Sequence, residues 1–340
     1  MMALKNLTCL IFNDLESFER SSIEPIIEHL SDSTAIETIW VTEAQRRFFR
    51  KKTRGDYWVV ARDWRRALDF LSWESFSGGR IFVSVLHMKQ EEKRLYGLSF
   101  RSFLKSLPKC LTLVVHSPLE LHFFHNIEKV PLGQLKLAPL AMAAHLKPQN
   151  NRVSDKFEIG TFCEFSVESN INFLLAVAHF VSKQSSQVHF NILGRGPLYA
   201  HFYRMIDSLQ LNDVVSIVET QSESSVSVLD LLIYAPLRNH HFIPVLLAGA
   251  FSVPVIATDL PGIHDFISAE NAGMVLPSYE VRALGEKILE ISRNPSLGKT
   301  LGHALNQHLK QNFSFSLINQ KYRDIFFGDG SMVETLARAA

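Results

Sequence analysis

The stretch Val228-Leu-Asp-Leu-Leu-Ile-Tyr-Ala-Pro-Leu-Arg-Asn-His-His-Phe-Ile-Pro-Val-Leu-Leu-Ala-Gly-Ala-Phe-Ser-Val-Pro-Val-Ile-Ala257 decides the fold of this chain. Its apolar run Leu231–Tyr234 ends at Pro236, and such a short continuous run is typical of a buried parallel strand. Pro244 suits the first turn of a helix, because the N–H group that proline lacks would have no partner there. We therefore predict a strand, a polar loop, a short apolar helix and a second buried strand.

The polar loop between Pro236 and Phe242 is a candidate ligand site. In an open parallel sheet, ligands bind beyond the carboxyl ends of the strands, and this loop follows such an end. Its candidate binding residues are Arg238, Asn239, His240 and His241. No further ligand is spaced near the two adjacent histidines, so we predict no metal site.

Strand-like and helix-like segments alternate along the rest of the chain. Five short apolar segments before residue 120 are separated by helical patterns: 7–12, 36–41, 57–61, 81–86 and 110–115. The alternation resumes after the polar stretch 147–156, which contains Pro148 and is the predicted linker. These patterns predict an α/β protein of two doubly wound, Rossmann-like domains, residues 1–146 and 157–326, followed by a tail, residues 327–340.

The composition is that of a globular protein with room for two domains. The chain has 340 residues, of which 46% are hydrophobic and 20% charged, and a net charge of +1. No apolar run approaches the roughly 20 residues that span a bilayer, and the first residues do not resemble a signal peptide, so we expect a cytoplasmic protein. Three widely spaced cysteines fit neither a disulfide framework nor a zinc site. The sequence shows no Walker-type loop and no nucleophile-elbow serine, and we expect no nucleic-acid partner.

One segment of the first domain is strongly basic. Its basic residues are interleaved with two phenylalanines and are Arg46, Arg47, Arg50, Lys51 and Lys52. Basic residues among aromatic ones can bind an anionic membrane surface or another anionic partner, which would make the protein peripheral at a membrane. The same pattern also fits a solvated helix that packs both phenylalanines inward.

Two further candidate sites lie where predicted strands end. Gly194-Arg195-Gly196-Pro197 stands between a strand-like and a helical segment. Such a turn either presents backbone N–H groups to a phosphate or simply makes a tight connection. His116 follows the strand at 110–115, which places it at the edge of a ligand site as a candidate catalytic residue. The alternative is a loop histidine that is satisfied by local hydrogen bonds.

The segment Ile243-Pro-Val-Leu-Leu-Ala248, followed by Pro254-Val-Ile-Ala-Thr258, resembles the donor-site segment of the family-four retaining glycosyltransferases. The resemblance covers about residues 155–326 and implies the GT-B fold, in which two Rossmann-like domains face a cleft. It implies an acceptor-side first domain, a second domain that binds the nucleotide-sugar donor, and a last helix that returns towards the first domain. The family also has a glycine turn at the position of Gly194–Pro197, and often a histidine at the position of His116.

Four charged donor-site positions of the family are replaced in this chain. The two family glutamates fall at Asn239 and Leu247, and the family arginine and lysine fall at Glu164 and Ser169. A carboxylate that faces a diphosphate is repelled by it, and the repulsion costs roughly several kcal/mol at a moderate effective dielectric. Leu247 cannot accept a hydrogen bond from a ribose. The resemblance therefore implies a degenerate donor site.

Two functions follow from these patterns. The first is a glycosyltransferase-like binding or scaffold protein, without catalysis, whose partner is a protein or a glycan. The alternative is an active hexosyltransferase that uses a nucleotide diphosphate sugar as substrate and needs no cofactor. In that alternative the donor site is rebuilt from other residues, for which the candidates are Arg195, Arg238, His240 and His241.

Overall fold

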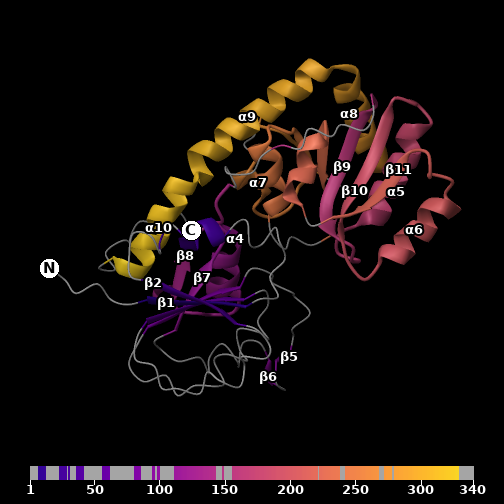
Figure 1. Ribbon diagram of the computed structural model, residues 1–340. Coiled ribbons are helices and arrows are strands. Elements are labelled where there is room, and N and C mark those ends of the chain that lie inside the picture. Colours follow the sequence, from indigo (N-terminus) through magenta and orange to yellow (C-terminus); the bar gives the residue numbers. More distant parts are fainter. Residues whose placement is uncertain are drawn as a thin grey trace. The chain divides into compact units, whose positions relative to one another are not determined.

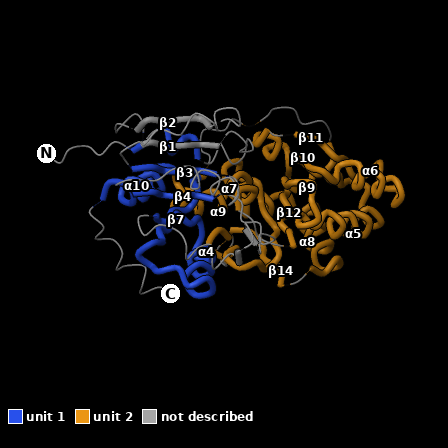
Figure 2. The backbone as a smooth tube through the Cα atoms, turned by 90° about the horizontal axis from the view of Figure 1, so that it is seen from below, with its two compact units in different colours: residues 1–141, 315–340 blue, residues 142–314 orange. Residues whose placement is uncertain are grey.

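The computed structural model describes residues 7–12, 23–28, 30, 36–41, 56–61, 80–85, 94–95, 98–99, 111–142, 148, 155–220, 222–237, 242–267, 272–277 and 279–328. The chain divides into two compact units (Figure 2). Unit 1 consists of residues 1–141 and 315–340, and unit 2 of residues 142–314. The chain therefore passes between the units twice, after residue 141 and after residue 314.

Unit 1 is built on a six-stranded parallel sheet, some of whose strands are labelled in Figure 1, and its strand order is β2-β1-β3-β4-β7-β8. Its strands are β1 (Leu7–Phe12), β2 (Ile36–Val41), β3 (Asp56–Ala61), β4 (Ile81–Val85), β7 (Leu111–Val115) and β8 (Leu135–Leu137). β5 (Arg94–Leu95) and β6 (Leu98–Ser99) form a separate antiparallel pair. β3 and β4 are buried along almost their whole length, as expected for parallel strands covered on both faces.

The described helices of unit 1 include α4 (Pro118–His122), the π-helix η2 (Phe123–Ile127), the 3₁₀ turn η3 (Leu132–Gln134) and α10 (Phe315–Phe327). Residues 23–28 are also helical. The sequence predicts one helix over residues 119–127. The structure has a helical path there, but its second half is wound as a π-helix.

Helix α10 packs on strands of unit 1 through aromatic rings. Trp58 of β3 is fully buried, and its ring centroid lies 5.2 Å from that of Tyr322 and 4.7 Å from that of Phe326. Phe82 of β4 lies edge-on to Phe326 at 4.9 Å. Large buried aromatic side chains contribute strongly to packing, so these rings fix the helix on the sheet.

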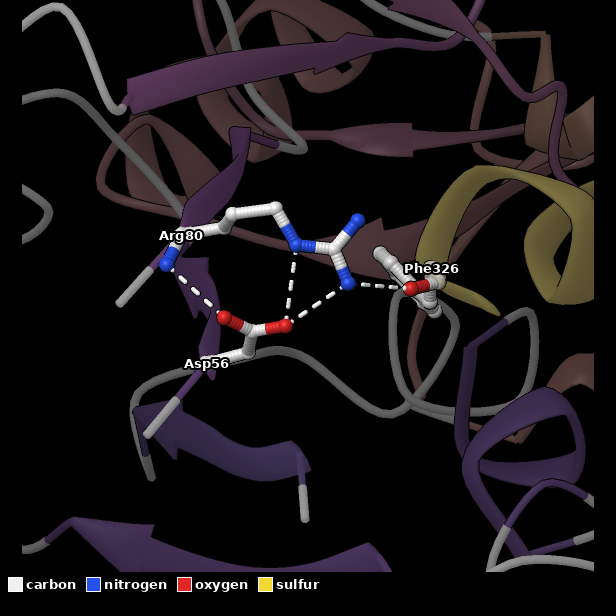
Figure 3. A network of polar contacts seen from close by, with 3 residues as sticks. All are labelled: Asp56, Arg80 and Phe326. Carbon is white, nitrogen blue, oxygen red and sulfur yellow. Dashed lines mark hydrogen bonds and ion pairs between the residues drawn. The ribbon is translucent and has the colours of Figure 1, made fainter. Parts of the chain in front are cut away.

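A charged contact holds the end of the same helix (Figure 3). The Arg80 guanidinium donates two hydrogen bonds to the Asp56 carboxylate, at 2.9 and 2.7 Å, and one to the carbonyl of Phe326 at 2.7 Å. The last carbonyls of a helix lack partners within the helix, and a cation there is favoured by the helix dipole. Arg80 therefore acts as a C-terminal cap of α10 that is supplied by the residue just before β4.

Unit 2 is built on a second six-stranded parallel sheet with the order β11-β10-β9-β12-β13-β14 (Figure 1). Its strands are β9 (Phe157–Glu164), β10 (Val188–Arg195), β11 (Val215–Glu219), β12 (Leu231–Tyr234), β13 (Val255–Thr258) and β14 (Met274–Leu276). The strand order reverses between β9 and β12. In such doubly wound sheets the reversal marks the usual ligand crevice, beyond the carboxyl ends of the strands.

The helices of unit 2 cover both faces of this sheet. They are α5 (Ile171–Ser182), α6 (Tyr199–Ser208), η4 (Glu223–Val228), α7 (Ile243–Ala250), η5 (Ile263–Asp265), α8 (Val281–Arg293) and α9 (Pro295–Phe313). α5, α6 and α8 share one apolar core with the sheet. α7 is anchored by the buried Asn306 of α9, whose amide donates to the carbonyl of Gly249 at 2.6 Å.

The strand, helix and second strand predicted within residues 228–257 are confirmed as β12, α7 and β13. The predicted fold class, two doubly wound α/β sheets, is confirmed as well. Some boundaries differ. β10 continues to Arg195, two residues beyond the predicted strand end, because both residues pair with β9. In the described part of the chain, no helix is long and apolar enough to cross a membrane.

Candidate functional site

The strand-order reversal of unit 2, where a ligand usually binds in this topology, lies between the loops that follow β9 and β12. These loops are tied to each other: Leu237 N–H donates to the carbonyl of Glu168 at 2.8 Å, and the Asn170 side-chain amide donates to the carbonyl of Ala235 at 3.1 Å. Asn170 itself takes a left-handed backbone conformation, with φ of 57°. Hydrogen bonds across the strand-order reversal therefore join the two walls of the position where a ligand usually binds.

Two of the positions at which the family resemblance implies a replaced donor-site residue lie in the first of these loops. The Ser169 hydroxyl donates to the carbonyl of Glu164 and lies 3.3 Å from the Ser166 hydroxyl. Glu164 is the last residue of β9, is half-buried, and stands opposite Arg195 of β10 in the parallel register. The serine thus bonds within its own loop, and neither position supplies a positive charge.

The glycine turn after β10 lies against the same loop. A Cβ on Gly194 would collide with the carbonyl of Cys163, and one on Gly196 would come within 2.6 Å of the Phe165 nitrogen. Their φ angles, 143° and 157°, also favour glycine. Phe165 N–H donates to the carbonyl of Arg195 at 2.7 Å. Both glycines are thus required by the close approach of two backbone segments, and Arg195 is exposed at this edge.

Leu247, the third position at which the resemblance implies a replaced residue, lies in the middle of α7 and is 1% exposed. Every residue of this helix from Ile243 to Gly249 is buried. An ionised carboxylate at this depth would lose its hydration without a charge partner, which is costly. Of the other candidates, the whole loop Arg238–His241 lies outside the described residues. The basic residues Arg46, Arg47, Arg50, Lys51 and Lys52 lie outside them too.

Exposed apolar side chains stand on the loops at this edge. Val167, in the loop after β9, is 65% exposed, and Leu237 and Tyr279 are exposed as well. Tyr279 is fixed there, because its hydroxyl donates to the carbonyl of Pro236 at 2.6 Å and its ring lies edge-on to Phe173. Sequence reasoning missed this surface, since three apolar residues in three separate loops leave no local pattern.

In unit 1, His116 directly follows β7, as the sequence predicts. The side chain is 8% exposed, and its Nδ1 lies 2.9 Å from the carbonyl oxygen of Ala138. A carbonyl oxygen only accepts hydrogen bonds, so the ring proton is on Nδ1 and Nε2 carries a lone pair. Nε2 is buried without a hydrogen-bond partner among the described residues. Burial lowers the pKa of His116 to about 4, so the ring is neutral at pH 7.

Glu120 holds the backbone of this histidine. Its carboxylate accepts from His116 N–H at 2.6 Å, while Glu120 N–H donates to the hydroxyl of Ser117 at 3.1 Å. Burial raises the pKa of Glu120 to about 7, against the opposing effect of backbone hydrogen bonds from His116 and Ser117. The sequence signal for this arrangement is Ser117-Pro-Leu-Glu120, a capping box with proline in the first helical turn, which the sequence analysis overlooked.

Tyr322 of α10 completes the group. It is fully buried, and its hydroxyl donates to the same Ala138 carbonyl at 3.3 Å. Burial raises the pKa of Tyr322 above its ordinary value, and the charge of Glu120 adds to that effect. Chemically, the group around His116 offers a buried acceptor to a hydroxyl. In the described residues, no three histidine, cysteine or acidic side chains gather as metal ligands would.

Comparison with known proteins places unit 2 in a family. Residues 144–311 match the family of glycosyl transferases group 1. The poly(ribitol-phosphate) alpha-N-acetylglucosaminyltransferase of Staphylococcus aureus (strain COL) is 22% identical over 171 residues, which are 49% of this chain and 35% of that protein. A putative colanic acid biosynthesis glycosyltransferase of Escherichia coli (strain K12), WcaL, is 23% identical over 146 residues, or 40% of this chain and 36% of that one. The chain thus matches about a third of the length of these curated relatives.

Solved structures resemble nearly the whole chain. Sucrose-phosphate synthase from Thermosynechococcus elongatus has a TM-score of 0.75 at 14% identity, covering 95% of this chain and 99% of that one. Alr3699/HepE from Anabaena, in complex with UDP and glucose, has a TM-score of 0.72 at 11% identity, covering 94% and 98%. At such identities the likeness shows the fold alone, and the predicted GT-B fold is confirmed.

Proposed function

Since residues 144–311 belong to the group 1 glycosyl transferases, we propose that this protein keeps the GT-B fold to bind a glycan and does not transfer a sugar. The observation that carries the proposal is the burial of Leu247, which is 1% exposed inside α7. A transferase of this family is expected to hold the nucleotide ribose with a carboxylate at this position. Here the position belongs to the apolar core of its unit.

The rest of the donor side supports the same reading. Transfer from a nucleotide diphosphate requires positive charge or oriented N–H donors against the leaving group. Ser169 instead donates to its own loop, and Glu164 adds a carboxylate at the end of β9. The loops on the two sides of the strand-order reversal bond to each other through Leu237 and Asn170.

The binding role rests on unit 1. His116 Nε2 is a buried lone pair with no partner among the described residues, and a sugar hydroxyl is a suitable donor for it. An unpaired buried acceptor costs free energy, which a bound donor would recover. The exposed Val167, Leu237 and Tyr279 of unit 2 would favour a protein partner on that side.

One observation favours the alternative, an active nucleotide-sugar-dependent hexosyltransferase. Arg195 is exposed at the carboxyl end of β10, next to the glycine turn, where a diphosphate could reach it. Arg238, His240 and His241 would then have to complete the site.

Calorimetric titration separates the two functions. The proposal expects no binding of UDP or GDP tighter than about 1 mM, which corresponds to roughly 4 kcal/mol, and no hydrolysis of nucleotide sugars. Tight binding that Arg238→Ala abolishes would sink it. A glycan array should identify ligands whose binding is lost in His116→Ala and retained in His201→Ala, which changes an exposed histidine on α6 of unit 2.

A further inference from the structure

We propose that Tyr322 is a positioning residue for His116: helix α10 keeps the imidazole in its Nδ1–H form, so that Nε2 keeps the lone pair of an acceptor. This inference deepens the proposed function, because it concerns how the binding histidine is held. It rests on that function for its biological meaning. Its test needs no ligand.

The two side chains meet on one backbone oxygen. His116 Nδ1 lies 2.9 Å from the Ala138 carbonyl oxygen, and the Tyr322 hydroxyl lies 3.3 Å from the same atom. The tyrosine is 184 residues away from Ala138 in the sequence, so this meeting exists only while α10 is docked. Both partners must donate to the carbonyl, which fixes the imidazole proton on Nδ1.

The same helix packs next to the carbonyl that holds the histidine. Tyr322 and Phe326 are buried against Trp58, and the Tyr322 hydroxyl bonds to the carbonyl that His116 uses. Burial is the main cause of the low pKa of His116. We expect that water would reach the ring if α10 left the sheet. An imidazole in water has a pKa of about 6.5, so half of the rings would be protonated at that pH. The protonated ring donates at both nitrogens and can no longer accept a hydroxyl hydrogen bond.

The charges around the histidine do not replace this effect. Titratable side chains on the elements around His116 include Glu120 of α4, Tyr322 of α10 and Lys136 of β8. Glu120 binds the backbone N–H of His116, and the ring nitrogen is held by Ala138. We therefore expect the packing of α10 on the sheet to be what changes the pKa of His116.

Arg80 provides a way to loosen the helix at a distance from the histidine. Its guanidinium bonds the Phe326 carbonyl at the far end of α10, one turn beyond Tyr322, and is oriented by Asp56 (Figure 3). Removing the guanidinium should let the end of α10 open more often, while no residue that contacts His116 or its carbonyl partner is substituted.

The main test compares Tyr322→Ala with Tyr322→Phe. Nitrogen NMR of the His116 ring reports its tautomer and its pKa together. Tyr322→Ala should raise the pKa of His116 by at least about one unit towards its value in water, a tenfold change in proton affinity. Tyr322→Phe keeps the covering ring and should rescue the low pKa and the Nδ1–H tautomer. Tyr279→Phe, which removes a tyrosine hydroxyl from a backbone carbonyl in unit 2, is the matched control. A folded Tyr322→Ala variant with the original pKa and tautomer overturns the proposal.

A second variant serves if Tyr322→Ala does not fold. In Arg80→Met, hydrogen exchange at the imidazole C2 of His116 should become several-fold faster, since exchange follows ring exposure and protonation. The exposed His201 is an internal reference. Lys287→Met, which breaks an exposed ion pair with Glu290 in unit 2, should leave His116 unchanged. An unchanged rate at His116 in Arg80→Met counts against the proposal.

The two proposals fail separately. If no glycan depends on His116 but the ring still responds to Tyr322, the proposed function is wrong and the positioning role stands. If a glycan binds through His116 while its pKa ignores Tyr322 and Arg80, the positioning role is wrong and the proposed function stands.

Discussion

The carboxyl edges of the two sheets carry different chemistry. In unit 1 the edge keeps a buried polar group, in which Glu120, Ala138 and Tyr322 hold His116, and its buried Nε2 has no partner among the described residues. In unit 2 the loops at the strand-order reversal bond to each other, and their exposed surface includes Val167. Both units have the doubly wound topology that places ligands at this edge. Topology therefore provides the position of a site, and side chains decide whether it is used.

The largest expected effect comes from introducing a carboxylate at position 247 of unit 2, where the resemblance implies one. Leu247→Glu should lower the free energy of unfolding by on the order of 4 kcal/mol, because it buries a charge without a partner. Leu247→Met conserves volume and should cost less than about 1.5 kcal/mol. Urea denaturation of the three proteins measures both. A well-tolerated Leu247→Glu that gains UDP binding would show that this side chain faces a ligand site, and the contrast between the two edges would disappear.

The second prediction concerns pH and the polar group of unit 1. The folded-state pKa of Glu120 is raised from 4.5 to about 7. The folded state therefore keeps a proton that the unfolded state loses, and the free energy of unfolding falls as pH rises between these values, by up to about 3 kcal/mol. His116 acts with the opposite sign, because its folded-state pKa is lowered to about 4 and stability is lost as pH falls from 6.5 towards that value.

The two effects partly cancel between pH 4.5 and 6.5, so single substitutions should separate them. Glutamine is accepted in a capping box, so Glu120→Gln should keep the fold. As pH rises, the free energy of unfolding of Glu120→Gln should increase relative to that of the natural protein. From pH 4.5 to 6.5 the free energy of unfolding of the variant should also increase in itself, because the effect of His116 remains. Urea denaturation at several pH values checks this. Parallel pH curves for the two proteins would mean that Glu120 does not titrate with a raised pKa.

A smaller effect is expected at Ser169. Ser169→Ala removes the hydroxyl that donates to the Glu164 carbonyl and should cost about 1 kcal/mol, the usual net value of one hydrogen bond. Ser169→Lys restores the residue type of the family. It should give no thermal stabilisation by UDP, because Glu164 and Leu247 remain. Stabilisation by UDP in Ser169→Lys alone would show that unit 2 lacks a single charge and not a whole site.

The weakest effect concerns the basic segment of unit 1, which lies outside the described residues. If it binds an anionic membrane surface, each basic residue should add about 1 kcal/mol at low salt. Flotation with anionic liposomes should then be weakened by Arg46→Ala and more strongly by the triple change with Arg47→Ala and Arg50→Ala. Failure of the natural protein to float even at low salt would leave His116 as the binding feature proposed for unit 1.

Much of the fold could be predicted from the sequence because its signals are local. The apolar runs of β12 and β13, with Pro244 between them, specify strand, helix and strand within one stretch of 30 residues. The end of β10 was placed two residues early, because glycine and arginine are poor strand signals. Pairing with Cys163 and Glu164 of β9 overrides that preference.

Less of the candidate site could be predicted. The sequence correctly predicts that His116 directly follows a strand, and the spacing from Pro244 correctly predicts that Leu247 lies in an apolar helix. The role of Glu120 could also have been predicted, from the capping box Ser117-Pro-Leu-Glu120. The exposed Val167 and Tyr279 could not have been found, because nothing in a single loop tells which apolar residue stays uncovered.

The sequence by itself determined the alternation of strands and helices, the apolar character of the segment that became α7, and the position of a histidine after a strand. These depend on residue type and on short spacing. Only the tertiary structure decided that the His116 ring carries its proton on Nδ1, and that its Nε2 is buried without a partner among the described residues. That state depends on a carbonyl 22 residues away and on a tyrosine that reaches the same carbonyl from 184 residues away. Hydrogen bonds and burial between distant segments form only when the chain has folded, so local sequence cannot specify them.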